Sequence, residues 1–564
     1  MASARPANAF VIGGIVVLVV AYALSALWGW PQYATRAINS HEHAAAVEHG
    51  DEVVAEHEGA EHEATGHEAA EHEAAEHEAA EHEAAEHEAA EHEGAEHAAT
   101  DHMLAEKPEA PPPLWAVLPF VTLLGAIAIL PLVPAAEHWW ESNLNRFYVA
   151  ASLGLITLVY YFLIHAYSVE LHFLGHGLVH PSESGASFNV AWTVFQNAIF
   201  GEYIPFIVLL FSLYTISGGI RIEGDLRAHP LTNAIFIGVG GVLASFIGTT
   251  GAAMLLIRPL LETNAERRHV RHTVVFFIFV VCNCGGCLLP IGDPPLFLGY
   301  LQGVPFLWTM NLILPWLVVN GSLIVVYFLW DHFFLYPTEK KTDISRDETQ
   351  TRRLRFSGFK LNALLLLGVI LSVALLDPSK ALPGTTWHPW LYLREIVQLG
   401  LVGVSLWCGS AATREANNFN YGAIVEVAAL FLGIFICMQP ALQILDFNGP
   451  NLGIDSPTKF FWLTGSLSGV LDNAPTYLVF FRTAQTLPSD GFVTIARVAE
   501  PRLVAISLGA VFMGAMTYIG NGPNFMVKAV AEKSGVKMPG FFGYMMYSFG
   551  ILLPILIVMS LIFF

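Results

Sequence analysis

The sequence IGDPPLF at 291–297 interrupts a long apolar segment with glycine, two prolines and a carboxylate. A similar sequence, IGNGPNF at 519–525, interrupts a second apolar segment 228 residues later. Lipid does not tolerate an exposed irregular backbone, so each break must line a cavity walled by protein or filled with water. Two broken apolar segments at matching places in the two halves of a chain are the best sequence indication of a secondary transporter's binding site.

The composition is that of a membrane protein. The chain has 564 residues, of which 13% are charged, and its mean hydropathy is +0.52. The net charge of −21 comes from residues 41–102, which hold 19 Glu, 2 Asp and no Lys or Arg. The rest of the chain has 27 acidic and 27 basic residues, so no basic stripe suggests nucleic acid as a partner. We expect a multi-pass protein of the bacterial inner membrane, with the lipid bilayer as its main partner.

Apolar segments of spanning length recur along the chain. Two of them, 231–261 and 459–482, are about twice that length with arms that are marginal for full spans, so each predicts a re-entrant hairpin. The remaining expected segments are 114–135, 147–167, 202–220, 273–303 (broken), 306–331, 361–378, 391–410, 421–444, 502–532 (broken) and 541–564.

The distribution of Lys and Arg predicts how these segments are oriented. Basic residues gather at 221–227, 258–271, 340–360 and 528–537, which the positive-inside rule assigns to the cytoplasm. The two hairpins then enter from opposite sides. The predicted fold is an all-α polytopic membrane protein with two inverted-topology repeats, each with a re-entrant hairpin and a discontinuous transmembrane helix.

We expect five regions in the chain. The apolar stretch 10–30 predicts a first membrane helix or signal anchor, although small residues near its end also fit a cleaved signal peptide. The regions are an anchor at 1–40, a His/Glu-rich low-complexity periplasmic segment with a proline linker at 41–113, repeat 1 at 114–331, a basic cytoplasmic linker at 332–360, and repeat 2 at 361–564.

In the His/Glu-rich tract, histidine recurs every five residues. On a helix this step turns by about 140°, so the imidazoles spiral around the axis and form no single metal-binding face. The tract is interpreted as a solvated spacer, a weak trap for Zn or Ni, or a pH sensor. The candidate metal ligands are His57, His62, His67, His72, His77, His82, His87, His92 and His97.

Polar residues gather at the hairpin tips and the helix breaks. The first tip is GTTGAA at 248–253 and the second is LDNAPT at 471–476. Their hydroxyl, amide and carboxylate oxygens are hard ligands that suit Na⁺. The predicted ion- and proton-binding residues are Thr249, Thr250, Asn283, Asp293, Asp472, Asn473, Thr476, Asn521 and Asn524.

Asp293 and Asp472 are the strongest candidates in this set. A charged side chain deep in a membrane costs at least about 2.5–3.5 kcal/mol, so its presence indicates a cavity and a function. A carboxylate that holds either H⁺ or Na⁺ is the minimal device for antiport. The alternative is that these carboxylates, and the neighbouring hydroxyl and amide groups, only bond the broken backbone.

Further residues allow more than one interpretation. Glu426, in an apolar run, is either a proton-relay acid or a side chain that snorkels to the interface. Glu202, at the end of a segment, is expected at the interface. Cys282, Cys284 and Cys287 could bind a soft metal, but we favour packing of small residues where a helix breaks. No phosphate loop, nucleophile elbow or His-Glu-x-x-His motif occurs, so we expect neither an enzyme nor a cofactor.

Four motifs together resemble a known family. They are GTTGAAMLLIRP (248–259), GGCLLPIGDPPLFLG (285–299), LDNAPT and IGNGPNF. They resemble the ion transporter superfamily, in particular the NhaD-type sodium/proton antiporters and the related citrate transporters, over residues 114–564. The resemblance implies two inverted repeats, often a homodimer, and transport roles for Asn283, Asp293, Asp472 and Asn473. Better-studied antiporters carry acidic residues near the first hairpin, where this chain has Thr249-Thr250-Gly251.

The first hypothesis is a Na⁺(Li⁺)/H⁺ antiporter that works by alternating access, with Asp293 and Asp472 exchanging cation for proton. The alternative is a Na⁺- or H⁺-coupled citrate or dicarboxylate transporter, in which the hairpin Thr and Asn groups bind a substrate carboxylate. A remote third hypothesis is a membrane-anchored periplasmic metal-trapping protein. The repeated helix breaks argue against it, because an anchor needs none.

Overall fold

The chain is described by a computed structural model that covers residues 4–39, 110–174, 177–182, 185–340, 342, 344 and 352–564. In these residues, 7 helices, or up to 8 if a bent pair counts as one span, are long and apolar enough to cross a membrane. The only sheets in the described part are three two-stranded antiparallel pairs. The prediction of an all-α polytopic membrane protein is confirmed, whereas the inverted relation of the repeats stays a prediction.

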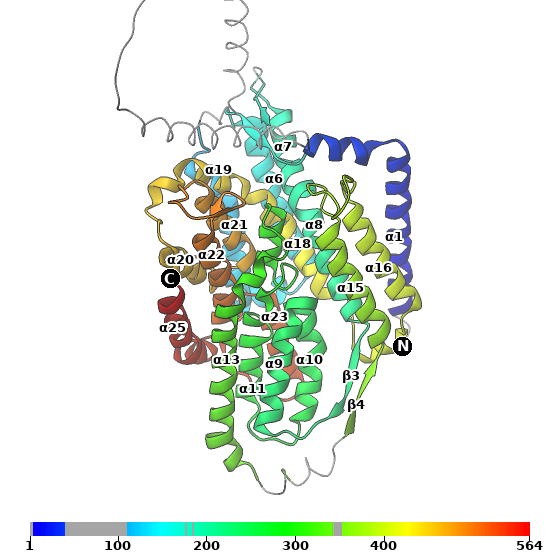
Figure 1. The fold of residues 1–564 in the computed structure, drawn as a ribbon, viewed down its shortest axis with the longest axis vertical. Coiled ribbons are helices and arrows are strands. Elements are labelled where there is room, and N and C mark those ends of the chain that lie inside the picture. The colour runs from blue at the N-terminus through cyan, green and yellow to red at the C-terminus, as the bar shows by residue number, and fades with distance from the viewer. Residues whose placement is uncertain are drawn as a thin grey trace, which may run out of the picture.

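The N-terminal helix α1 (Ala4–Leu27) packs on the outside of α16 (Leu393–Cys408) and runs alongside it (Figure 1). Its Tyr22 hydroxyl donates to the Leu391 carbonyl at 3.0 Å, and the Asn39 amide beyond it donates to the Pro378 carbonyl at 3.3 Å. The N-terminal segment is therefore bonded to the second half of the chain, and α1 is long and apolar enough to cross a membrane.

The first half continues with a helical layer at the periphery and then the first hairpin. One long helix runs from 188 to 217 through a π-helical turn, so the segment predicted at 202–220 begins earlier in the structure. The elements are η1 (Leu114–Val117), α4 (Leu118–Ile129), η2 (Leu130–Leu132), α5 (Pro134–Trp140), α6 (Asn143–Leu163), β1 (Val169–Leu171), β2 (Gly177–Val179), α7 (Phe188–Gln196), η3 (Asn197–Tyr203), α8 (Ile204–Ser217), β3 (Arg221–Asp225), α9 (Pro230–Ile247), α10 (Thr249–Thr263), α11 (Arg271–Val280), η4 (Cys284–Cys287), α12 (Pro294–Leu301), η5 (Trp308–Leu312), α13 (Ile313–Trp330), η6 (Asp331–Leu335) and η7 (Tyr336–Thr338).

The second half repeats the order of a hairpin, a broken helix and a terminal span. The segment predicted at 421–444 is bent by 41° between its two helices. The elements are β4 (Arg352–Ser357), α15 (Phe359–Leu375), α16, α17 (Ala411–Ala416), α18 (Gly422–Cys437), α19 (Gln439–Asn448), η8 (Gly449–Leu452), α20 (Pro457–Ser468), α21 (Asn473–Gln485), β5 (Thr494–Ile495), β6 (Val498–Ala499), α22 (Glu500–Met513), η9 (Gly514–Met516), α23 (Gly522–Lys533), α24 (Phe541–Tyr547), η10 (Ser548–Leu552) and α25 (Leu553–Phe563).

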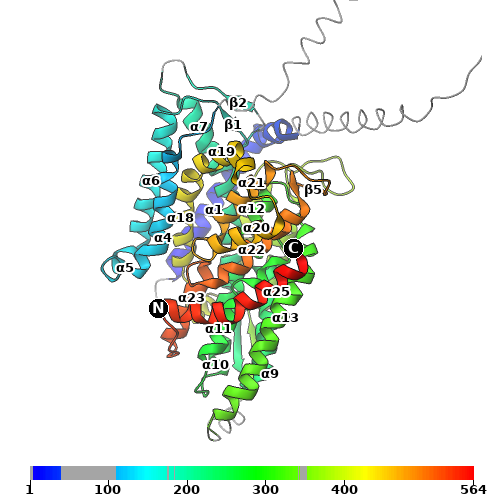
Figure 2. The ribbon, with the colours of Figure 1, turned by 90° about the vertical axis from the view of Figure 1, so that its left-hand side faces the viewer.

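Two helical pairs form the hairpins, and two interrupted helices follow them. The arms α9 and α10 contact each other, as do α20 and α21, and the two pairs lie towards opposite ends of the long axis (Figures 1 and 2). Gly248, with φ of 78°, ends α9 in a backbone conformation that residues other than glycine rarely adopt. The predicted first tip is therefore where the chain turns.

At both helix breaks, one glycine lies close to the backbone carbonyl of another glycine six residues earlier. A Cβ on Gly292 would lie 2.2 Å from the Gly286 carbonyl oxygen, and one on Gly520 would lie 2.6 Å from the Gly514 carbonyl oxygen. Both separations are shorter than real Cβ contacts, so only glycine fits at either place. This matching requirement explains why the sequences at 291–297 and 519–525 share a glycine at their second position.

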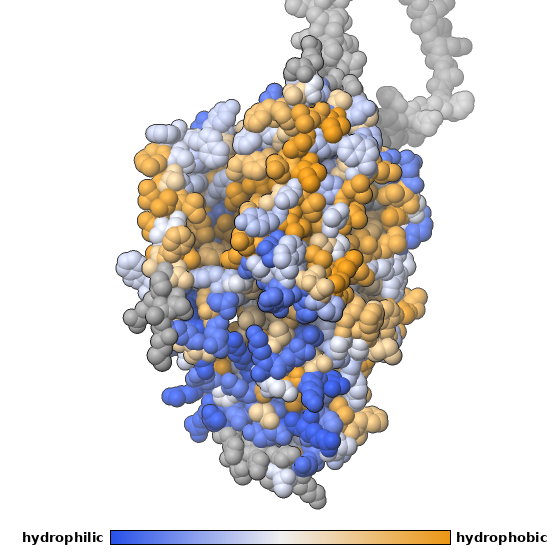
Figure 3. All heavy atoms as spheres, turned by 180° about the vertical axis from the view of Figure 1, so that it is seen from behind, coloured by the Kyte–Doolittle hydropathy of each residue, from blue (hydrophilic) through white to orange (hydrophobic). Residues whose placement is uncertain are grey.

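The clustered basic residues gather at one end of the molecule. Strand β3 pairs with β4, and Arg271 Nε donates to the Lys537 carbonyl at 2.7 Å. Figure 3 shows hydrophobic residues over the upper part of one face and hydrophilic residues below them. The cytoplasmic linker expected at 332–360 thus contains a strand, β4, that the sequence did not predict.

Candidate ion-binding site

Four helices begin at one place in the centre of the molecule. Asp293 and Asn521 are the N-cap residues of α12 and α23, and Asp472 is that of α21. Helix α10 begins at Thr249, whose backbone N–H donates to the Gly292 carbonyl at 2.8 Å. These breaks place the predicted polar residues at helix N-termini, which carry positive partial charge.

The Asp293 carboxylate joins all four of these helices. It accepts hydrogen bonds from Thr249 Oγ1 at 2.8 Å, Asn473 Nδ2 at 2.7 Å and Asn521 Nδ2 at 3.0 Å. The residue is 1% exposed. Both hairpin tips and both helix breaks therefore meet at one buried carboxylate, and its three donors suit the ionised acceptor form.

Asp472 caps the second hairpin beside Asn473. Its Oδ1 accepts from the Ala474 backbone N–H at 3.1 Å, and its charge acts electrostatically on Asp293. The side chain is only partly covered by the rest of the protein. Two carboxylates of different exposure thus occupy neighbouring positions, one enclosed and one at the edge of the cluster.

Three asparagines connect the two breaks to each other. Asn283 Nδ2 donates to Asn524 Oδ1 at 2.7 Å and to the Ile278 carbonyl at 2.9 Å. Asn524 Nδ2 donates to the Thr517 carbonyl at 3.0 Å, and Asn521 Nδ2 donates to the Cys282 carbonyl at 3.0 Å. Their amides therefore satisfy broken backbone. Asn283 Oδ1 is buried without a hydrogen-bond partner, which leaves a hard oxygen free in the cluster.

Other predicted residues lie beside or outside this cluster. Thr476 Oγ1 donates to the Asp472 carbonyl at 2.9 Å, a bond within the helix, while Thr250 is half-buried and makes no side-chain hydrogen bond in the described part of the chain. Glu426 forms an ion pair with Arg146 of α6 at 2.7 Å, so the structure does not bring it to the cluster. His57 to His97 lie outside the described residues.

The three cysteines lie at the first break. Cys282, Cys284 and Cys287 are buried and free. The described residues contain no group of three or more His, Cys, Asp or Glu side chains that could hold a metal ion. Backbone contacts at this break explain the need for small side chains: Ser245 Oγ of α9 donates to the Gly285 carbonyl at 2.6 Å.

A narrow cleft leads to the first hairpin tip from the predicted cytoplasmic end. Its volume is about 30 Å³, and Gly251, Met254 and Asn417 are among its lining residues. Asn417 Nδ2 donates to the Ile220 carbonyl at 2.7 Å, and Arg258 donates to the Asn417 carbonyl. A space of this size holds about one water molecule.

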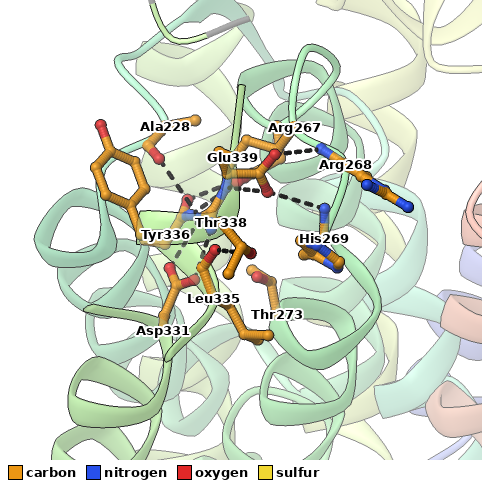
Figure 4. Close-up of polar contacts among 12 residues, drawn as sticks. Ala228, Arg267, Arg268, His269, Thr273, Asp331, Leu335, Tyr336, Thr338 and Glu339 are labelled. Atoms are coloured by element: carbon orange, nitrogen blue, oxygen red, sulfur yellow. Dashed lines mark hydrogen bonds and ion pairs between the residues drawn. The ribbon is translucent and has the colours of Figure 1, made fainter. Parts of the chain in front are cut away.

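A second buried polar cluster lies away from the helix breaks (Figure 4). Arg267 forms two bonds to Asp331, at 2.8 and 2.6 Å, and His272 Nε2 lies 3.1 Å from the same carboxylate. The Glu339 carboxylate accepts from the backbone N–H groups of Arg268 and His269 at 2.9 and 3.0 Å. The cluster ties the loop after the first hairpin to the end of α13, and the sequence analysis missed it.

Glu202 does not lie where the sequence predicted it. The interface was predicted, but the residue is 9% exposed and lies in the π-helical turn η3. The prediction failed because the sequence placed the start of the segment at 202, whereas the helix begins at Phe188 and Glu202 lies within it. The cover here comes from α7, α8 and α18.

Comparison with known proteins identifies the family. A family model described as "Putative citrate transport" matches residues 109–564. The chain belongs to this family. Two proteins named as uncharacterized transporters, from Mycobacterium bovis and Mycobacterium tuberculosis, are each 22% identical over 330 residues, 55% of this chain and 72% of the relative. The citrate transport family lies within the predicted resemblance, and the chain is a multi-pass membrane transporter.

Proposed function

We propose that this transporter exchanges Na⁺ or Li⁺ for H⁺ across the bacterial inner membrane by alternating access, with Asp293 and Asp472 holding the exchanged ions. The observation that carries the proposal is the convergence of four helix starts on Asp293. A cation at this carboxylate contacts both hairpins and both broken helices at once. Its binding and release are therefore coupled to the relative positions of these elements.

The charges in the cluster favour a cation as substrate. The cluster contains two carboxylates, Asp293 and Asp472, and its other side chains are the neutral Thr and Asn residues described above. A second negative charge near Asp293 opposes binding of an anion and favours binding of Na⁺ or H⁺. Since each carboxylate can neutralise one such ion, occupation by Na⁺ and by H⁺ is mutually exclusive, which is the condition for exchange.

The space around the first hairpin also fits a small ion. The cleft beside Gly251 has room for about one water molecule, so a water-sized ion fits there. Na⁺ prefers oxygen ligands; the Thr249 hydroxyl supplies one at the carboxylate, and the unpartnered Asn283 Oδ1 is a second oxygen at the first helix break.

The test is ion exchange in proteoliposomes that contain a pH-sensitive dye. We expect Na⁺ or Li⁺ added on one side to drive H⁺ to the other, and Asp472→Asn to abolish this flux while the protein stays folded in detergent. Failure of both cations to move protons, together with accumulation of labelled citrate, would replace antiport by the second candidate. Full exchange by the Asp472→Asn variant would remove that residue from the mechanism.

The second candidate is cation-coupled transport of citrate or another dicarboxylate. The family description favours it, and so do the four helix N-termini at the site, because an N-terminus attracts anions. In this scheme the bound cations neutralise Asp293 and Asp472, and Asn473 and Thr249 bind a substrate carboxylate. Uptake of labelled citrate that depends on a Na⁺ or H⁺ gradient distinguishes it from antiport.

A further inference from the structure

Glu202 is a buried acid outside the proposed ion site. It lies in η3, a π-helical turn within the long helix that ends with α8. Such turns inside α-helices often mark functional positions. One carboxylate oxygen, Oε1, accepts from Gln302 Nε2 at 3.4 Å, and the other, Oε2, is buried without a hydrogen-bond partner. This side chain is therefore incompletely satisfied in a covered place, which requires an explanation.

Two helices that begin at the proposed ion site end beside Glu202. Gln302 is the C-cap of α12, whose N-cap is Asp293, and Arg482 lies in the last turn of α21, whose N-cap is Asp472. The Arg482 guanidinium acts electrostatically on Glu202. At a rise of about 1.5 Å per residue, the eight residues of α12 span about 12 Å. Glu202 is thus bonded to the far end of α12 and lies within the electrostatic range of a cation at the far end of α21.

The other charged groups near η3 are already paired, which leaves Arg482 as the counter-ion in the described part of the chain. Helices α7 and α8 carry no acidic or basic side chain, and Glu426 of α18 pairs with Arg146 at 2.7 Å. The charged groups that face η3 from β1 and from the start of α16 also form ion pairs. Glu170 pairs with His172 at 3.7 Å, and Arg394 pairs with Glu395 at 2.6 Å. The Tyr392 hydroxyl, next to Arg394, donates to the Phe200 carbonyl in η3.

We propose that Glu202 is a proton-carrying residue of the transport cycle, which takes up a proton when α21 moves and carries the positive charge of Arg482 away from it. In the conformation described here, the positive charge of Arg482 favours the ionised form of Glu202 against the effect of burial. A movement of the second hairpin withdraws that guanidinium, and a buried carboxylate without a counter-ion is costly. Water that reaches Glu202 in that state supplies a proton, which forms the O–H bond of a neutral carboxyl group. Return of Arg482 favours the carboxylate again, and the proton passes back to water.

This inference rests on the proposed exchange of Na⁺ for H⁺ and adds a proton site to it. The test compares two fluxes in proteoliposomes: proton movement driven by Na⁺, and counterflow of labelled Na⁺ without a pH gradient. Glu202→Gln keeps the shape of the side chain but cannot ionise. We expect this variant to lose Na⁺-driven proton movement and to retain Na⁺ counterflow, while Glu202→Asp restores proton movement with a shifted pH profile. Glu532→Gln, in the exposed pair with Lys528, is the control and should leave both fluxes unchanged.

Several outcomes overturn the inference. Proton movement and pH profile identical to the wild type in Glu202→Gln would show that the residue carries no proton. Parallel loss of both fluxes in the Gln and Asp variants would show a structural role. If Glu202→Gln does not fold, Arg482→Gln serves instead: loss of the counter-ion makes ionisation of Glu202 harder, so proton movement should require higher pH, and an unchanged profile refutes the proposal. A wild type without Na⁺-driven proton movement overturns the proposed function, and this inference falls with it.

Discussion

Replacing Asp293 by Asn removes one charge and almost no volume from the centre of the site. A unit charge attracts a cation at about 4 Å by about 4 kcal/mol when the effective dielectric constant is about 20. This energy corresponds to about a thousandfold in binding. The folded protein loses much less, because the Asn amide oxygen still accepts from Thr249 and Asn521. The bond to Asn473 is the one put at risk, at a cost of about 1–3 kcal/mol.

We therefore expect Asp293→Asn to fold in detergent and to lose saturable Na⁺- or Li⁺-driven proton flux in proteoliposomes. The measurement is the dependence of the flux on cation concentration, together with thermal unfolding of the same preparation. A half-saturating Na⁺ concentration within a few-fold of the wild type would refute the assignment of the carboxylate as a cation ligand.

The matched control is the same substitution at Asp331, which is also fully buried but belongs to the cluster with Arg267 (Figure 4). Breaking a buried ion pair costs about 3–5 kcal/mol, because the remaining charge is left without its partner. We expect Asp331→Asn to lower the unfolding temperature clearly while the folded fraction keeps the wild-type half-saturating Na⁺ concentration. The two variants should thus show opposite patterns in the two measurements.

Three further predictions concern single features. Thr249→Val should raise the half-saturating Na⁺ concentration by about tenfold or more, equivalent to ~1.4 kcal/mol, while Thr249→Ser keeps the wild-type value. Gly433→Ala should destabilise the α6–α18 contact by about 1–3 kcal/mol in thermal unfolding, because its Cβ would lie 2.6 Å from the Ala150 carbonyl oxygen; Gly400→Ala, with open space around it, should not. Deleting 41–102 should leave ion exchange in vesicles largely intact, and loss at every pH would refute the spacer interpretation.

The sequence predicted the helix breaks because the responsible residues are local. Gly248 turns the first hairpin, and the Pro294-Pro295 pair starts a helix at once after Asp293. Because such Gly and Pro residues occur at corresponding places in both halves, the sequence indicates which polar residues belong to one site. The structure brings most of them together, since Asp293 contacts a residue from each of the other three segments.

The features that escaped prediction depend on contacts distant in sequence. Arg267 and Asp331 are 64 residues apart, and neither sits in a motif. Strand β4 forms by pairing with β3; Leu354 and Phe356 alternate with arginines, but all its residues except Ser357 are exposed, so the alternation marks no buried face. Glu202 has the same sequence context whether lipid or protein covers it, so only packing decides its role.

Because Asp293 is hydrogen-bonded to three segments besides its own, its charge acts on the elements whose movement would carry an ion across the membrane. Under the proposed exchange, an unloaded site leaves a charged carboxylate without a cation in the membrane interior, and carrying such a charge through the apolar region costs at least about 2.5–3.5 kcal/mol. An empty molecule would then be held back from crossing, whereas one loaded with Na⁺ or H⁺ would not. In this scheme, the charge of one side chain suppresses slippage, in which a carrier returns empty and lets an ion gradient collapse without exchange, and no separate gate is needed.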